Sequence, residues 1–437
     1  MIAFEHPLGI NKAATSLLMG CFLWILYLYA APDLVHTGQS AQEAKNYVID
    51  FQIIESLGDI SETLLFLIGA MTIVHIIDVH GGFSYIAEVI HTRNKRKLLW
   101  ITAWITFFLS ALLDNLTTTI VMVILMRGLV GEKKLRWLYG SFIVLAANAG
   151  GAWSPIGDVT TIMLWIKGNI TAQGVIPQLI LPSIMSLLVP LIICTLYLHG
   201  EVEPLEETPN QKLTPEAKLQ ARLTHRDKLS ILLLGVMFLL LVPVFKAVTG
   251  MPPFAGIILG LGLLWMYTDI FYKKRRKLDD NIKQPVSKVL QKVDVSTLMF
   301  FFGILLAVDA LRYAGILTTM SEWLDMHSPN IYMLDGLIGA VSSVVDNVPL
   351  VAASIGMYPV DTTTATSIYS IDGSFWTLLA YCAGVGGSML IIGSAAGVVL
   401  MGLEHISFGW YFKRITPLAI VGYLSGMLFF YLQELVF

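Results

Sequence analysis

The sequence predicts an all-α, polytopic membrane protein made of two inverted repeats, each with a re-entrant helical hairpin and a broken transmembrane helix. The chain of 437 residues is 56% hydrophobic and only 14% charged, whereas a soluble domain carries about 25% charged residues. Its apolar residues form blocks close to the ~20 residues that a helix needs to cross a bilayer. An Asp-Asn pair lies deep inside such a block twice, at Asp114-Asn115 and at Asp346-Asn347. Because polar pairs are costly in a membrane, two matched pairs indicate facing sites in a transporter with internal repeats.

The composition argues against several other classes of protein. A net charge of −3 gives no sign of a nucleic-acid or acidic partner. Cys21, Cys194 and Cys382 each lie in an apolar block, which is typical of free, packed thiols. No P-loop, Gly-x-Ser-x-Gly or His-Glu-x-x-His pattern is present, so ATP drive and familiar hydrolase chemistry have no support. We expect a secondary transporter and not an enzyme, with no cofactor beyond the ions that it carries.

The spans and their orientation follow from hydropathy and from the placement of Lys and Arg. Candidate spans lie at 13–31, 60–80, 98–128, 137–168, 176–198, 229–248, 254–272, 295–316, 331–358, 373–405 and 415–436. The first block lacks a cleavage pattern after it, so it is expected to remain as a span. Basic connectors stay in the cytoplasm and lie at 93–97, 127–136, 212–228, 273–292 and 413–414. The connectors poor in Lys and Arg are placed outside and lie at 32–58, 169–175, 317–330 and 359–372.

Two of these segments are predicted to be re-entrant hairpins. Segment 98–128 has basic connectors on both sides, so both of its ends belong on the cytoplasmic side. As one helix it would be ~46 Å long at about 1.5 Å per residue, more than the ~30 Å hydrocarbon core requires. A break at Asp114-Asn115 gives two halves that each reach the midplane. Segment 331–358 has non-basic flanks and should enter from outside, with its break supplied by Pro349.

Sequence similarity between the halves predicts the same inversion independently. The matched positions are 65–69 with 299–303, Gly81 with Gly315, Gly150, Gly151 and Gly157 with Gly386, Gly387 and Gly393, and Trp24 with Trp265. Span 60–80 should run inward and its partner 295–316 outward, with 229–248 as the odd crossing that makes inversion possible. The first repeat is therefore placed at 1–199, a cytoplasmic linker at 200–228, and the extra span with the second repeat at 229–437. The broken helices are expected at 137–168 and 373–405.

The polar breaks in the apolar pattern predict a cation site. They lie at 114–119, 148–158, 346–349 and 384–394. Backbone leaves the helix inside a bilayer only where protein or a water-filled cavity satisfies it, and the exposed oxygens can replace the hydration shell of a small hard cation. We hypothesise that Asp114, Asp158 and Asp346 share Na⁺ and H⁺ binding. Neighbouring amides and hydroxyls would complete the coordination, namely Asn115, Asn148, Asn347 and Ser388. Competition of Na⁺ and H⁺ for one carboxylate, with alternating access, is sufficient for antiport.

Plainer roles are available for several of these polar residues. Asp114 and Asp158 could simply cap the helices that follow them. Thr160 and Thr161 could each bond a carbonyl one turn earlier, as could Thr118 and Thr119. Ser388 and Ser394 are each close to an even choice between a site role and a structural one. These roles are compatible with ion binding, so they do not decide against it.

Polar residues outside the breaks have mainly structural interpretations. His75, Asp78 and His80 form an H-x-x-D-x-H pattern at the cytoplasmic end of span 60–80, where a pH-responsive or structural role is favoured over a metal site. Asp59 and Glu62 open the same span, where acids cap a helix N-terminus, with ion entry as the alternative. Asp309 and Arg312 are spaced to pair on one helix.

Residues 64–74, 110–119 and 148–161 together resemble the NhaD-type sodium/proton antiporters of the ion transporter superfamily. The resemblance covers nearly the whole chain from about residue 50. It implies an inner-membrane exchanger of Na⁺, often Li⁺, for H⁺, and a homodimer. Carried over by motif, the functional residues of the family fall on Asp114, Asn115, Asn148, Asp158, Thr160, Thr161, Ser342, Asp346, Asn347 and Ser388. The chain departs from the family at His75, where an acid is usual, which bears on the pH profile.

Two alternatives remain at this stage. An anion carrier on the same scaffold would use helix N-termini and hydroxyl-rich loops without fixed acids, which the two acidic tips argue against. A sodium-coupled dicarboxylate carrier would also have cation sites, so the acidic tips do not argue against it. A channel is disfavoured by the inverted duplication, and an intramembrane enzyme lacks a nucleophile-base or metal set at one depth.

Overall fold

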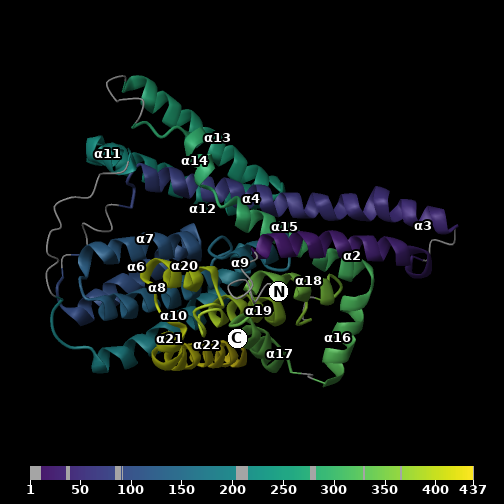
Figure 1. Ribbon diagram of the computed structural model, residues 1–437. Coiled ribbons are helices and arrows are strands. Elements are labelled where there is room, and N and C mark those ends of the chain that lie inside the picture. The colour runs from purple at the N-terminus through teal and green to yellow at the C-terminus, as the bar shows by residue number, and fades with distance from the viewer. Residues whose placement is uncertain are drawn as a thin grey trace.

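The computed structural model describes residues 11–35, 40–83, 90, 92–202, 215–275, 282–327, 330–364 and 367–436. In these residues the regular elements are helices, and the single β-bridge joins Asn94 to Glu201. Eight of the helices are long and apolar enough to cross a membrane. The predicted all-α, polytopic fold class is therefore confirmed (Figure 1).

The helices divide into two series joined by a short middle segment. The first series is α2 (Lys12–Leu34), α3 (Ala41–Tyr47), the π-helical η2 (Val48–Gln52), α4 (Ile53–Val79), α6 (Lys95–Leu113), α7 (Asn115–Leu129), α8 (Lys133–Ala152), α9 (Val159–Ile166) and α10 (Ala172–Tyr197). The middle segment holds α11 (Pro215–Arg222) and α12 (His225–Thr249). The second series is α13 (Pro253–Lys274), α14 (Val286–Val289), η3 (Leu290–Lys292), α15 (Val295–Tyr313), α16 (Ile316–His327), α17 (Ile331–Ser342), α18 (Asn347–Met357), α19 (Ser374–Gly386), α20 (Ala395–Glu404), α21 (Phe408–Arg414) and α22 (Thr416–Val436).

The packing of the two series is symmetric. Helix α2 packs on α15 as α13 packs on α4, and α6 packs on α8 as α17 packs on α19. Helices α7 and α20 form a pair matched by α18 and α9, and α10 packs on α22. In Figure 1, α4 and α13 cross above the body that contains α6 to α10 and α19 to α22. These contacts in one series thus have counterparts in the other, as internal repeats require.

The matched helices α4 and α15 run in opposite directions. At one end, the Ser56 hydroxyl of α4 donates a hydrogen bond of 2.6 Å to Asp309 of α15. Towards the other end, Val74 of α4 and Thr297 of α15 line the same cavity. The glycines that follow them, Gly81 and Gly315, share a left-handed backbone with φ of 75° and 74°. The repeats are therefore inverted, with the same turn closing each helix.

The first hairpin consists of α6 and α7, which meet at Asp114. Lys95, at the start of α6, has its Nζ 3.8 Å from Oε2 of Glu132, just beyond the end of α7. Tyr139 of α8 donates a hydrogen bond of 2.8 Å to the Lys95 carbonyl oxygen. Both ends of the hairpin therefore lie together, which is the geometry of a re-entrant segment.

The second hairpin consists of α17 and α18, and Pro349 lies in the first turn of α18, where its missing N–H costs no helical bond.

One predicted connector is wrong. Residues 41–79 form a continuous helical stretch of 39 residues, although 32–58 was expected to be a connector. The stretch starts in a capping box of Ser40 and Glu43, and residues 41–57 contain neither Gly nor Pro. Asp59 and Glu62 consequently lie inside the helix, and the capping role predicted for them is wrong. Likewise the connector 317–330 is mostly helical, because it contains α16.

Candidate cation site

Four helices begin where the sequence predicted breaks, and each starts at a polar N-cap. The Asp114 carboxylate accepts a hydrogen bond from Thr117 N at 2.8 Å, and Asp158 accepts one from Thr160 N at 3.1 Å. In the second repeat, Asp346 accepts from Val348 N at 3.4 Å, and the Ser394 hydroxyl from Gly397 N at 3.2 Å. Three carboxylates therefore lie at helix N-termini, where the helix dipole favours negative charge. The capping role predicted for Asp114 and Asp158 therefore occurs, and it is compatible with ion binding.

A buried hydrogen-bond network connects the two repeats between these helix ends. The Asn115 Nδ2 donates to Asn148 Oδ1 at 3.0 Å and to Asp158 Oδ2 at 2.8 Å. The Asn148 Nδ2 donates to the hydroxyls of Ser388 and Ser394 at 2.8 and 3.0 Å. Each of these side chains is at most 5% exposed. Residues of α7, α8 and the two broken-helix turns are thus held at one buried point.

The remaining two predicted carboxylates lie around this network. Asp158 is within electrostatic range of both Asp114 and Asp346, which come from opposite hairpins. Asp114 Oδ2 also accepts a hydrogen bond of 2.8 Å from the Thr117 hydroxyl. Asp346 forms an ion pair with the Lys12 ammonium at 3.2 Å, which sequence analysis did not anticipate. The acids of both halves therefore share one region of the interior, and one of them already has a positive partner.

Other predicted site residues make backbone contacts. The Ser342 hydroxyl donates to the Ala383 carbonyl at 2.9 Å, and Ser110 donates to Ala147 at 2.6 Å in the first repeat. These matched bonds tie each hairpin to its broken helix. The Thr161 hydroxyl donates to the Asp158 carbonyl at 2.8 Å, as the plainer alternative predicted. Thr160 is fully buried beside Asp158, and Asn347 is 5% exposed at the start of α18.

The two repeats differ in their polar side chains. Counted from the matched glycines, Ser394 occupies the position of Asp158, and Gly384 that of Asn148. A Cβ atom at Gly384 would lie 3.7 Å from Asp158 Oδ2. At this position the second repeat therefore has no side chain beside the Asp158 carboxylate. The centre of the network is therefore asymmetric in charge, although the backbone around it is symmetric.

His75, Asp78 and His80 do not form a metal site, because no group of three or more candidate ligands occurs in the described residues. His80 is fully buried, with Nδ1 2.7 Å from the Ile76 carbonyl and Nε2 2.7 Å from the Tyr272 hydroxyl. A carbonyl can only accept, so Nδ1 carries a hydrogen. Both ring nitrogens thus have a protein partner, which fits the structural alternative for His80. His75 and Asp78 are half-buried on α4, within electrostatic range of Lys292.

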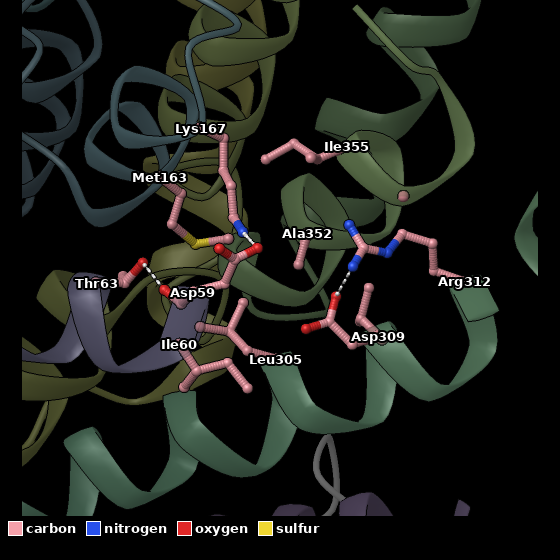
Figure 2. A pocket seen from close by; sticks show the side chains of 12 residues that line it. Asp59, Ile60, Thr63, Met163, Lys167, Leu305, Asp309, Arg312, Ala352 and Ile355 are labelled. Atoms are coloured by element: carbon pink, nitrogen blue, oxygen red, sulfur yellow. Dashed lines mark hydrogen bonds and ion pairs between the residues drawn. The ribbon is translucent and has the colours of Figure 1, made fainter. Parts of the chain in front are cut away.

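A cavity lined in part by charged side chains lies between α4, α9, α15 and α18 (Figure 2). Asp59 and Lys167 point toward one another across it and form an ion pair between α4 and α9. Asp309 and Arg312 form the predicted pair within α15 at 3.4 Å. Sequence analysis missed the partner of Asp59, because α9 and α4 are distant in the chain. The helices that form the cavity include α9 and α18, which begin at Asp158 and Asp346.

Membrane-length helices in inverted repeats, with acids and amides buried at helix breaks, define a multi-pass secondary transporter. A model of the citrate transporter family, CitMHS, matches residues 1–370. The chain therefore belongs to this family, part of the ion transporter superfamily, and it is a transporter and not an enzyme.

Individual relatives and a solved structure are also similar to the chain. Sodium/proton antiporter 1 of Arabidopsis thaliana is 45% identical over 98% of this chain and 69% of its own length. The Na⁺/H⁺ antiporter NhaD of Vibrio cholerae is 30% identical over 98% of this chain and 88% of its own length. The crystal structure of the Alcanivorax borkumensis YdaH transporter has a TM-score of 0.58 at 13% identity, covering 96% of this chain and 97% of that one. That structure supports the fold alone.

Proposed function

We propose that the protein exchanges Na⁺, and also Li⁺, for H⁺ across the cytoplasmic membrane, by competition of cation and proton for buried carboxylates with alternating access. The observation that carries the proposal is the buried network around Asp158, which brings a carboxylate, two amides and two hydroxyls to one point. The names of the relatives, sodium/proton antiporter and Na⁺/H⁺ antiporter, support the same exchange. An inner-membrane location and a homodimer belong to the proposal as well.

The network has the chemistry of a small cation site. Asn148 Oδ1 and Asp158 Oδ2 both accept from the same amide nitrogen of Asn115. These two oxygen atoms therefore both point at one partly positive group, the Asn115 amide nitrogen with its hydrogens. A rotation of the Asn115 amide would present its oxygen as well, giving Na⁺ a set of hard ligands of the kind it prefers. Protonation of Asp158 would remove the negative charge that makes the set attractive to a cation.

Citrate transport is the second candidate, because the description of the family model names it. A tricarboxylate would need positive groups, and helix N-termini are a common source. Here the N-termini of α7, α9 and α18 are already capped by Asp114, Asp158 and Asp346. Their carboxylates would repel an anion at the same place. The geometry therefore favours cation exchange.

A flux measurement in everted vesicles separates the two candidates. We expect Na⁺ and Li⁺ to dissipate a preset pH gradient when the protein is present, and citrate without these ions to leave the gradient unchanged. Choline chloride at equal ionic strength is the control. Uptake of labelled citrate, with no cation-dependent proton movement, would instead establish the second candidate and reject the first.

The ion pair between Lys12 and Asp346 yields a quantitative prediction. The two side chains are 28% and 16% exposed, so their attraction is only partly screened. In Lys12→Gln the Asp346 carboxylate loses its tethered positive partner and becomes available to Na⁺. We expect the half-saturating Na⁺ concentration to fall about fivefold, which corresponds to ~1 kcal/mol at 1.4 kcal/mol per tenfold. Initial exchange rates across a Na⁺ series measure it, with Lys12→Arg as the charge-preserving control. Equal Na⁺ dependence in Lys12→Gln and Lys12→Arg would show that the pair does not compete with Na⁺.

A further inference from the structure

Helix α17 carries a buried carboxyl group that neither the sequence analysis nor the network above includes. Asp335 is 0% exposed and lies near the start of α17, the first arm of the second hairpin. Within the described residues, neither of its carboxyl oxygens has a hydrogen-bond partner. A buried carboxylate is normally paired or hydrogen-bonded, because an isolated one costs far more than folding can supply. Asp335 therefore needs an explanation other than packing.

Among the described residues, the titratable groups given within electrostatic range of Asp335 are one thiol and three phenols, which are ordinarily neutral at neutral pH. They are Cys382 of α19, Tyr423 of α22, and Tyr358 and Tyr369 beyond the end of α18. The Tyr423 hydroxyl donates to the Gly336 carbonyl at 3.0 Å, and Tyr358 donates to Asp325 at 3.1 Å. The hydroxyl hydrogens of Tyr423 and Tyr358 are thus donated to other acceptors. With no positive charge among these neighbours, Asp335 can remain buried only as the neutral carboxylic acid.

The first repeat shows that the fold does not require an acid at this place. Asp335 lies seven residues before Ser342, and Ala103 lies seven residues before the matched Ser110. Ala103 is also buried, at 1% exposure, on α6 where that helix packs against α8. Alanine satisfies the packing in one half, so the acid in the other half serves a chemical purpose. Ionisable residues inside a membrane commonly lie on ion or proton pathways.

We propose that Asp335 is an additional proton-binding site of the transporter, separate from the carboxylates at the helix breaks and loaded from the outer side. Tyr358 donates a hydrogen bond of 3.1 Å to the exposed Asp325, and its ring stacks on that of Tyr369 with centroids 5.0 Å apart. Both tyrosines are within electrostatic range of Asp335, and Asp325 belongs to the connector 317–330 that is predicted to lie outside. The step breaks one carboxylic O–H bond and re-forms it, with the proton passing to or from water. The inference rests on the proposed function in one respect, because it assumes that the protein transports H⁺.

Infrared spectroscopy of the purified protein tests whether Asp335 is protonated. A protonated carboxyl group has a C=O stretch distinct from that of a carboxylate. We expect this band at neutral pH to lose the intensity of one group in Asp335→Asn and to be unchanged in Asp294→Asn, an exposed aspartate at the start of α15. If Asp335→Asn folds poorly, Asp335→Ala replaces it, since the first repeat holds alanine at the matched position. Equal bands in wild type and variant would overturn the inference.

Flux in proteoliposomes tests whether the proton moves. In Asp335→Asn we expect Na⁺-driven exchange to persist with fewer protons moved per Na⁺, and in Asp294→Asn the wild-type ratio. An unchanged ratio in Asp335→Asn would reject transport through this site. Absence of any Na⁺-driven proton movement in the wild type would reject the proposed function instead, while the infrared result would still decide whether Asp335 binds a proton.

Discussion

Asp114→Asn is expected to abolish Na⁺-dependent proton exchange while leaving the fold intact. The Asp114 side chain caps α7 by accepting from Thr117 N, and asparagine caps a helix as well as aspartate does. The substitution therefore removes the negative charge and the titrating group but retains the cap. We expect the exchange rate to fall below about one hundredth of wild type, as losing ~3 kcal/mol of cation binding would cause at 1.4 kcal/mol per tenfold. Everted vesicles with matched protein amounts provide the measurement.

Asp294→Asn is the matched control for this substitution. Asp294 caps α15 with the same hydrogen-bond pattern, accepting from Thr297 N at 3.1 Å and from the Thr297 hydroxyl at 2.6 Å. Its side chain is exposed, whereas Asp114 is half-buried. Its substitution should leave exchange at the wild-type rate. Full activity in Asp114→Asn, or equal loss in both variants, would remove Asp114 from the proposed site.

Alanine at Gly150 or at Gly386 is expected to prevent the protein from folding stably. A Cβ atom at Gly150 of α8 would lie 2.1 Å from the Phe107 carbonyl oxygen of α6. At the matched Gly386 of α19 it would lie 2.2 Å from the Gly339 carbonyl oxygen of α17. Both obstacles are backbone atoms of a hairpin arm, which cannot rotate away. Overpacking of a core costs 1–3 kcal/mol or more, and we expect at least about 3 kcal/mol here.

Thermal unfolding in detergent, followed by size-exclusion chromatography, measures this effect. Gly262→Ala in α13 is the control, because nothing lies within 4 Å of the added methyl group. That change should be neutral or stabilising by up to ~1 kcal/mol, since alanine favours helices over glycine. Wild-type unfolding temperatures in Gly150→Ala and Gly386→Ala would show that the hairpins do not pack on the broken helices at these glycines.

The fold was largely predictable because its signals are local and occur twice. The break at Asp114 and the turn at Gly81 each have a counterpart in the other half, at Asp346 and Gly315. Charge in the connectors also predicted that the two halves run in opposite directions. The long helix 41–79 was not predicted, because the polar residues of 41–47 suggested a connector, whereas helix continuity depends on the absence of breakers.

The site was predictable only in part, because its partners come from distant segments. Asp114, Asn148 and Asp158 were identified by polar character within apolar stretches. The ion pair of Asp346 with Lys12 joins residues 334 positions apart, and no local pattern indicates it. Asp335 was missed because one polar residue in a helix indicates neither its depth nor its neighbours. Side-chain partners across inverted repeats become visible only when the helices are packed.

Proton release on Na⁺ binding tests the competition most directly. Purified protein in weakly buffered detergent solution is mixed with NaCl or with choline chloride at fixed starting pH, and the pH change is recorded. We expect NaCl to acidify the solution in wild type, and choline chloride to have no effect. Na⁺ binding without any release of protons would contradict the shared use of these carboxylates by cation and proton.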